Sequence, residues 1–157
     1  MKKVILTTVT ILLVNLLNAQ WVQSEFVDEF GDKTGKKYEY IISDNGNFSN
    51  SATTGSKLTC KFIHSKKLSY IVVDVYEYGS SLANEIEATF ETVKIKQPSG
   101  NIVVINKVFF TKNGSLFFSK EKYQKLISSI KEKGKYKMVW KRTGNYSDSN
   151  YLINFKI

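Results

Sequence analysis

The chain has 157 residues, of which 42% are hydrophobic and 13% aromatic. These fractions exclude a disordered chain, and the length favours one domain with a single hydrophobic core. Cys60 is the only cysteine and His64 the only histidine. An intramolecular disulfide and a metal site built from several histidines are therefore excluded.

The first nineteen residues have the order of a secretory signal peptide. Two lysines open the chain, an apolar stretch runs on to Leu17, and Ala19 supplies the small residue at the expected cleavage site. The stretch is shorter than the roughly 20 apolar residues of a membrane-spanning helix, so we expect no transmembrane anchor. We predict a cleavable signal peptide over 1–19, a single β-rich domain over 20–157, and export to the periplasm or the extracellular space as a soluble protein.

An acidic segment follows the leader. Asp28, Glu29 and Asp32 surround Gly31, and three close carboxylates are ligands that Ca²⁺ accepts. Their spacing is not that of an EF-hand loop. The first interpretation is a turn in which Asp side chains accept hydrogen bonds from nearby backbone N–H groups, and a cation site is the alternative. We expect no cofactor.

Alternating polar and apolar residues predict strands through the middle of the chain. From Lys57 to His64 every second side chain falls on one apolar face, and Leu68 to Tyr78 is rich in β-branched and aromatic residues. The pair Asn45-Gly46 is typical of a two-residue hairpin turn, so we expect the strand from Tyr38 to Ile42 to pair with the segment after that turn. Residues 47–56 are expected to form a loop or an edge.

A second hairpin is expected after residue 86. Its apolar alternation shifts by one place before Val93, which predicts a bulge near Glu91 or Thr92. The segment Pro98–Asn101 has turn residues and should join this strand to a run that ends at Phe110. Asn113-Gly114 predicts the next tight turn.

One amphipathic helix is predicted at about 119–133, with Ser119 as its N-cap and Gly134 just after its end. Alternating strands should come next, at 135–141 and 151–157. Short turns and the absence of βαβ alternation predict a mainly β fold. We expect an antiparallel β-sandwich or a partly open barrel.

The residues that could carry catalysis do not form a set. Cys60 and His64 share a strand face but lie roughly 13 Å apart along an extended strand, too far for a hydrogen bond. We interpret Cys60 as a small core residue and His64 as a strand-end residue. No catalytic residue is predicted, and we expect a protein that is not an enzyme.

The positive charge is concentrated in the second half. From Asn101 onward twelve Lys or Arg residues stand against Glu121, Glu132 and Asp148. Tyrosines at alternate positions could add a stacking surface. The candidate binding residues are Lys120, Lys122, Lys125, Lys131, Lys133, Lys135, Lys137, Lys141, Tyr76 and Tyr78.

These residues suggest a noncatalytic exported binding or accessory module for anionic envelope polymer or an acidic protein. Nucleic acid is not expected as a partner because of export. Three alternatives remain open, and one is an enzyme in which carboxylates such as Asp74, Glu77 or Asp28 converge in a pocket. In another, the lysines serve only solubility and the tyrosines serve only packing. In the third, the domain is a protein-directed inhibitor or immunity factor that acts outside the cytoplasm.

Several short motifs support a resemblance. They are the leader, Trp21, the segment Asp28-Glu29-Phe30-Gly31-Asp32, the Ser/Thr-rich stretch 46–54 and the strand 56–62. Together they resemble an uncharacterised family of small exported bacterial β-rich proteins. The resemblance implies a β-sandwich-like fold and no particular activity, so it assigns no functional residues.

Overall fold

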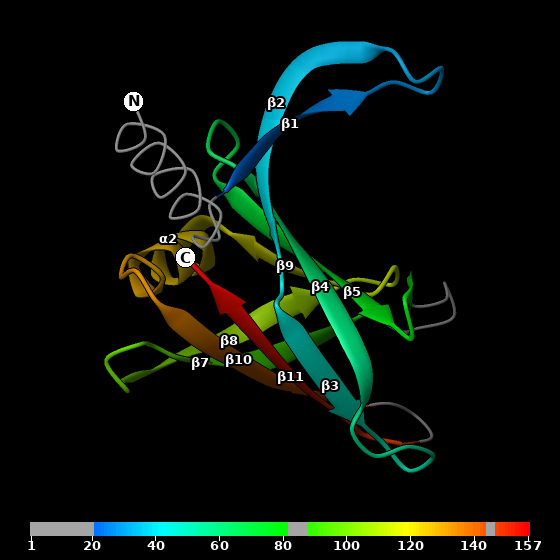
Figure 1. Ribbon diagram of the computed structural model, residues 1–157, viewed down its shortest axis with the longest axis vertical. Helices are drawn as coiled ribbons and strands as arrows, with labels where there is room; N and C mark the ends of the chain where they lie inside the picture. Colours follow the sequence, from blue (N-terminus) through cyan, green and yellow to red (C-terminus); the bar gives the residue numbers. More distant parts are fainter. Residues whose placement is uncertain (1–20, 82–87, 144–146) are drawn as a thin grey trace, which may run out of the picture.

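The computed structural model describes residues 21–81, 88–143 and 147–157, and it is mainly β (Figure 1). The predicted signal peptide lies outside these residues. In chain order the elements are β1 (Val22–Val27), β2 (Lys33–Ile42), β3 (Asn45–Ser49), β4 (Ser56–Ser65), β5 (Tyr70–Glu77), β6 (Ser80–Ser81), β7 (Thr89–Lys96), β8 (Ile102–Phe110), β9 (Ser115–Ser119), α2 (Lys120–Ser129), β10 (Lys135–Arg142) and β11 (Ser149–Lys156).

Eight strands close into an antiparallel barrel. Around the ring their order is β3, β4, β5, β9, β8, β7, β10 and β11, and β11 pairs with β3 again. The ring closes because β4 pairs with β3 at one edge and with β5 at the other. Closure gives the strands of the ring partners on both sides, which a sandwich does not. The sandwich expectation is therefore wrong, and the barrel expectation is correct, although the ring is closed and not partly open.

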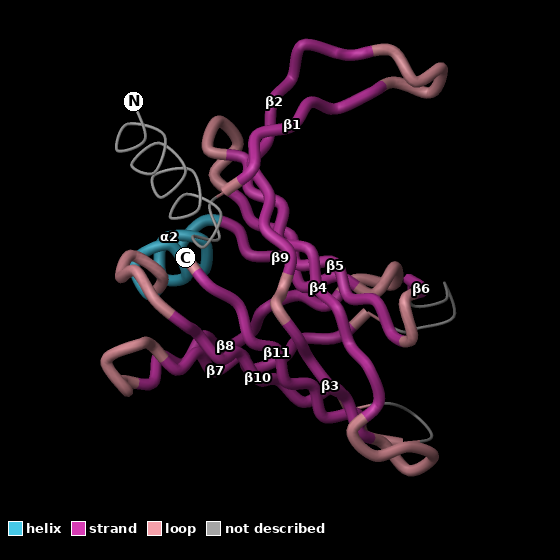
Figure 2. The backbone as a smooth tube through the Cα atoms, in the orientation of Figure 1, coloured by secondary structure: helices cyan, strands magenta, loops and turns pink. Residues whose placement is uncertain are grey.

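The remaining strands extend the sheet beyond the ring. Strand β2 pairs with the second half of β4, on the same edge that β3 uses further along. Strand β1 pairs only with β2 among the described strands, and the two form a hairpin that projects from the barrel (Figures 1 and 2).

The hairpin expected at Asn45-Gly46 is wrong. Gly46 lies within β3, so the loop expected from residue 47 starts only after Ser49, and a Cβ on Gly46 would come within 2.9 Å of the Leu152 carbonyl oxygen. Glycine is needed for close approach of neighbouring backbones and not for a turn. The chain bends just before it, where the Ser43 N–H donates to the Cys60 carbonyl and the Ser43 hydroxyl oxygen accepts from the Cys60 N–H.

The barrel interior is one apolar cluster, and local patterns placed much of it correctly. Strand β4 buries Leu58, Cys60, Phe62 and His64 on its inward face, as the alternation predicts. The bulge predicted in β7 is confirmed, since the pairing of β7 with β8 shifts between Glu91 and Val93. The turn predicted after Lys96 is also present.

The late helix is confirmed but is shorter than predicted. It ends at Ser129, because the Ile130 N–H already bonds in the tighter i−3 pattern to Ile127 and the Gln97 side chain donates to the Ser129 carbonyl. Ser119 is the N-cap residue, but its side chain makes no capping hydrogen bond. None of the helices in the described ranges has the length and apolarity to span a membrane.

Candidate functional site

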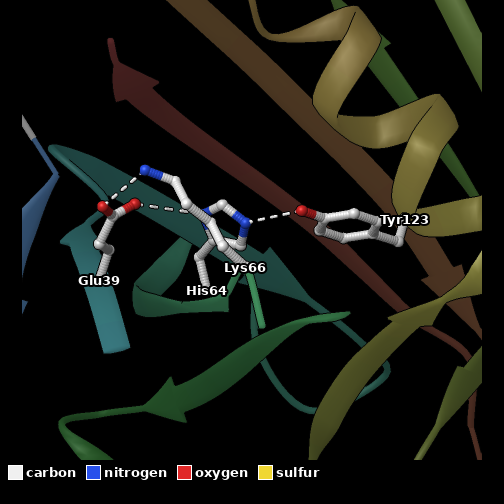
Figure 3. Close-up of polar contacts among 4 residues, drawn as sticks. All are labelled: Glu39, His64, Lys66 and Tyr123. Atoms are coloured by element: carbon white, nitrogen blue, oxygen red, sulfur yellow. Dashed lines mark hydrogen bonds and ion pairs between the residues drawn. The ribbon is translucent and has the colours of Figure 1, made fainter. Parts of the chain in front are cut away.

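An inward-facing histidine lies near the end of strand β4. His64 is the last residue in the buried alternation of β4, and it is 4% exposed. The pairing of β2 with β4 places Glu39 directly opposite His64, so the two side chains share a face. Helix α2 carries Tyr123, whose side chain points toward the imidazole (Figure 3).

These side chains form a continuous polar chain (Figure 3). His64 Nε2 lies 3.0 Å from the Tyr123 hydroxyl, and His64 Nδ1 lies 3.4 Å from Glu39 Oε2. Lys66 Nζ donates to the other carboxylate oxygen of Glu39 at 2.8 Å. The ring of Trp21 covers the imidazole at a centroid distance of 5.2 Å. Carboxylate, imidazole and phenol therefore succeed one another across the end of the barrel.

The surroundings assign the proton of the imidazole. Burial lowers the pKa of His64, the Glu39 carboxylate opposes that shift, and the nearby Lys66 ammonium adds to it. The ring is therefore neutral at pH 7 and carries one N–H. A bare Nδ1 facing the Glu39 carboxylate would be repelled, so we assign the hydrogen to Nδ1, with Tyr123 donating to Nε2.

This assignment leaves a buried donor whose contact with Glu39 is too poorly aligned to be a hydrogen bond. His64 Nδ1 has no hydrogen bond among the described residues, because its approach to Glu39 meets the ion-pair distance but not hydrogen-bond geometry. Buried N–H groups are nearly always paired in folded proteins, since an unmade hydrogen bond leaves the desolvation cost uncompensated.

A pocket of about 530 Å³ opens beside His64, between the β1–β2 arm and the turn after β4. Its apolar walls include Phe26 and Leu68. Its polar lining includes Gln23, Glu39, His64 and Ser65 together with Lys36, Lys37, Lys66 and Lys67. The volume lies within the range of small-molecule sites.

The structure gives the thiol no part in this site. Cys60 is fully buried in the barrel core, as predicted. Burial first, and then the charge of Asp74, raise the pKa of its thiol far above neutral pH. The thiolate is the nucleophilic form, so Cys60 is not poised for nucleophilic chemistry.

The predicted lysines fall into three groups. Lys120, Lys122 and Lys125 lie on α2, with Lys122 paired to Glu121 at 2.9 Å. Lys131 and Lys133 are exposed in the loop after the helix. A third group, on the outward face of β10, is Lys135, Lys137 and Lys141.

The strands beside β10 add further lysines to this outward face. We define the lysine face as the outward side chains Lys94, Lys96, Lys135, Lys137, Lys141 and Lys156 on β7, β10 and β11. Lys96 stands directly opposite Lys137, and Lys135 directly opposite Lys156. The outward positions of these three strands hold no carboxylate. Lys141 pairs at 2.5 Å with Asp148, which lies just before β11.

The predicted tyrosines do not join the lysine face. Three strands, β7, β8 and β9, separate β5 from β10 in the sheet. Tyr76 lies outward on β5 and is half-buried. Tyr78 comes just after β5 with a positive φ of 53°, packs edge-on against Phe48, and donates its hydroxyl hydrogen to Ser56. These contacts give Tyr78 a local packing role.

The acidic segment forms the turn between β1 and β2. Asp28 Oδ1 accepts hydrogen bonds from the backbone N–H groups of Phe30 and Asp32, both at 2.9 Å. This agrees with the interpretation of the segment as a turn. Across the described ranges, no group of three or more His, Cys, Asp or Glu side chains is placed to hold a metal ion. Asp28, Glu29 and Asp32 therefore do not converge as a cation site would require.

Sequence reasoning missed Glu39, Tyr123, Lys94, Lys96 and Lys156. Each becomes significant only through the pairing of strands or the position of α2, which a single sequence does not reveal. Comparison of the chain with protein-family models, with curated proteins and with solved structures gave no match. The functional argument therefore depends on the geometry of the molecule.

Proposed function

We propose that the protein is an exported, noncatalytic binding module that holds anionic envelope polymer on its lysine face. The observation that carries the proposal is the direct opposition of Lys96 to Lys137, with Lys135 beside Lys137 on the outward face of β10. Like charges directly opposite one another destabilise a sheet. Solubility does not require such pairs, since lysines spaced apart serve it equally well. A bound polyanion would relieve the repulsion.

The spacing of the lysines suits a flexible polyanion. Adjacent strands lie about 4.8 Å apart, and side chains on one face of a strand recur at about 7 Å. Lys94 and Lys96 form one such row, and Lys135 and Lys137 the next. A chain of carboxylates or phosphates crossing these rows meets several ammonium groups at once. The contacts are exposed, so salt should weaken them.

The proposed export supplies the context. Removal of a leader containing Lys2 and Lys3 would reduce the formal charge from +9 to +7. Outside the cytoplasm, cell-wall polymers and acidic polysaccharides are abundant polyanions, and a cationic surface attracts them over distances of about the Debye length. A soluble basic domain in that compartment would accumulate on such material.

The test is binding of the purified protein to immobilised polyphosphate and polygalacturonate, with neutral dextran as a blank. The variant Lys96→Glu/Lys135→Glu/Lys137→Glu reverses the charge of three side chains at the centre of the lysine face. At about 1 kcal/mol for each lysine near an anionic surface, affinity should fall roughly a hundredfold. The dependence of binding on salt should also become flatter.

A matched control reverses three exposed lysines outside the lysine face, Lys33, Lys57 and Lys112. It changes the net charge equally, so it should keep most of the affinity if position matters. Equal loss in both variants would reduce the effect to net charge and overturn the proposal. Retention on neither polymer, together with one stoichiometric protein partner from an envelope extract, would favour the inhibitor or immunity alternative.

A further inference from the structure

The pocket beneath the β1–β2 arm is a second site, separate from the lysine face. Its lining comes from β1, β2, the end of β4 and the turn after it, whereas the lysine face lies on β7, β10 and β11. Ligand binding in this pocket does not depend on the proposed function.

The inner part of the pocket offers an unused hydrogen-bond donor. His64 is 4% exposed, lines the pocket, and has no hydrogen bond at Nδ1 among the described residues. Tyr123 holds the opposite nitrogen at 3.0 Å and so fixes the orientation of the ring. Nδ1 is covered in this structure, with Glu39 Oε2 at 3.4 Å, so an acceptor atom in the pocket reaches Nδ1–H by displacing the Glu39 carboxylate.

The walls and the rim differ in character. Phe26 from the arm and Leu68 from the turn contribute apolar surface, and Leu68 is 65% exposed. Lys36, Lys37, Lys66 and Lys67 stand around them, against the single carboxylate of Glu39. With His64 neutral, four lysines and one glutamate leave a local charge of +3. The pocket therefore combines an apolar wall, a net positive rim and a buried donor.

We propose that this pocket binds a small amphiphilic anion, an apolar chain or ring that carries a carboxylate or phosphate group. The acidic group accepts from His64 Nδ1–H and lies beside Lys66, and the apolar part covers Phe26 and Leu68. The components are a concave apolar site and a few convergent polar groups that fix orientation. A free metabolite and a lipid headgroup share this chemistry, and we assign the pocket to the free molecule because a volume of about 530 Å³ suits one small ligand.

Glu39 gives the proposal a directional test. Its carboxylate holds Lys66 at 2.8 Å and repels an incoming anion. Glu39→Gln keeps the shape and an acceptor oxygen but removes the negative charge. It should therefore strengthen binding of an anion, by about threefold or more. A merely structural role of Glu39 predicts weaker binding or none.

The experiment is titration calorimetry of the purified, tag-free protein with laurate and with dodecyl phosphate below their critical micelle concentrations. Acetate and inorganic phosphate carry the acidic group alone, and dodecyl maltoside carries the apolar chain without charge. His64 is the only histidine, so the Hε1 signal of its imidazole is an unambiguous NMR probe. We expect both amphiphilic anions to bind and to shift that signal, and the partial ligands to bind at least about tenfold more weakly.

The variants complete the design. Lys66→Gln/Lys67→Gln should weaken laurate binding about tenfold, and the control Lys131→Gln/Lys133→Gln, which removes two exposed loop lysines, should leave it unchanged. Equal binding of dodecyl maltoside would show that the pocket does not select anions and would overturn the proposal. An imidazole chemical shift that does not change on addition of ligand would place the ligand outside this pocket. Binding only to vesicles of phosphatidylglycerol would show that the protein recognises a lipid surface, and it would overturn the proposal that the pocket binds a free ligand.

Discussion

The hydrogen bond between Tyr123 and His64 makes a measurable prediction about the barrel end. Tyr123 is 8% exposed, and its hydroxyl is the partner of a buried imidazole nitrogen. Tyr123→Phe removes the hydroxyl and keeps the ring. It leaves His64 Nε2 unpaired in a site that excludes water, at a cost of about 1–3 kcal/mol in the free energy of unfolding.

The assay is urea unfolding at pH 7 followed by tryptophan fluorescence, with thermal unfolding as a check. A loss of about 1–3 kcal/mol should lower the melting temperature by roughly 2–12 °C for a chain of this size. The slope of the unfolding free energy against urea concentration should equal that of the unmodified protein, because the surface exposed on unfolding does not change.

The control is Tyr78→Phe, the same chemical change at a residue that is 65% exposed. Its hydroxyl donates to Ser56 at 3.1 Å at the surface, where water replaces the lost partner. The control should change the free energy of unfolding by less than about 0.5 kcal/mol. If Tyr123→Phe also changes the free energy of unfolding by less than about 0.5 kcal/mol, then Nε2 is not a buried acceptor. The assignment of the proton to Nδ1 would then be wrong.

Three further predictions concern pH, the thiol and a glycine. Burial lowers the pKa of His64 in the folded protein, so the unfolded chain, titrating near about 6.5, binds the proton first. The stability that the neutral His64 contributes is complete above about pH 6.5, and it is lost as the pH falls from there toward the pKa of the folded protein. His64→Gln should therefore make the melting temperature depend less on pH between pH 7.5 and pH 5. Cys60 is fully buried, so a thiol reagent such as DTNB should react only after denaturation, and rapid reaction of the native protein would contradict the core position. Gly46→Ala places a Cβ 3.0 Å from the Leu58 carbonyl oxygen. It should lower the free energy of unfolding by about 1–3 kcal/mol in the same urea assay. An unchanged midpoint of unfolding would show that the strands can separate locally.

Local patterns predicted the parts of the fold that neighbouring residues determine. The buried face of β4, the bulge beside Glu91 and the existence of the late helix all result from alternation, periodicity or turn residues within about ten positions. Gly46 shows the limit of such reasoning. The pair Asn45-Gly46 has the composition of a turn, but the close approach of the β4 and β11 backbones determines its role. That constraint comes from the closed ring of strands.

The candidate site was harder to predict because its members are far apart in sequence. The spacing along β4 separates His64 from Cys60, but it does not indicate which residues contact the imidazole. Its actual neighbours are Glu39, which depends on the register between β2 and β4, and Tyr123, which depends on where α2 packs. Alternation could have indicated that His64 points inward, and an inward-facing histidine needs a partner.

The two candidate sites should be functionally independent because of their positions in the fold. The lysine face occupies β7, β10 and β11, and the pocket occupies β1, β2 and the end of β4, with β3 between β4 and β11 in the ring. Exposed charges separated by more than about 8 Å interact little at physiological salt. Reversal of Lys96, Lys135 and Lys137 should therefore leave laurate binding unchanged, and Glu39→Gln should leave polymer binding unchanged. A coupled loss in either direction would show that one ligand contacts both surfaces, and the two proposals would then merge into one extended site.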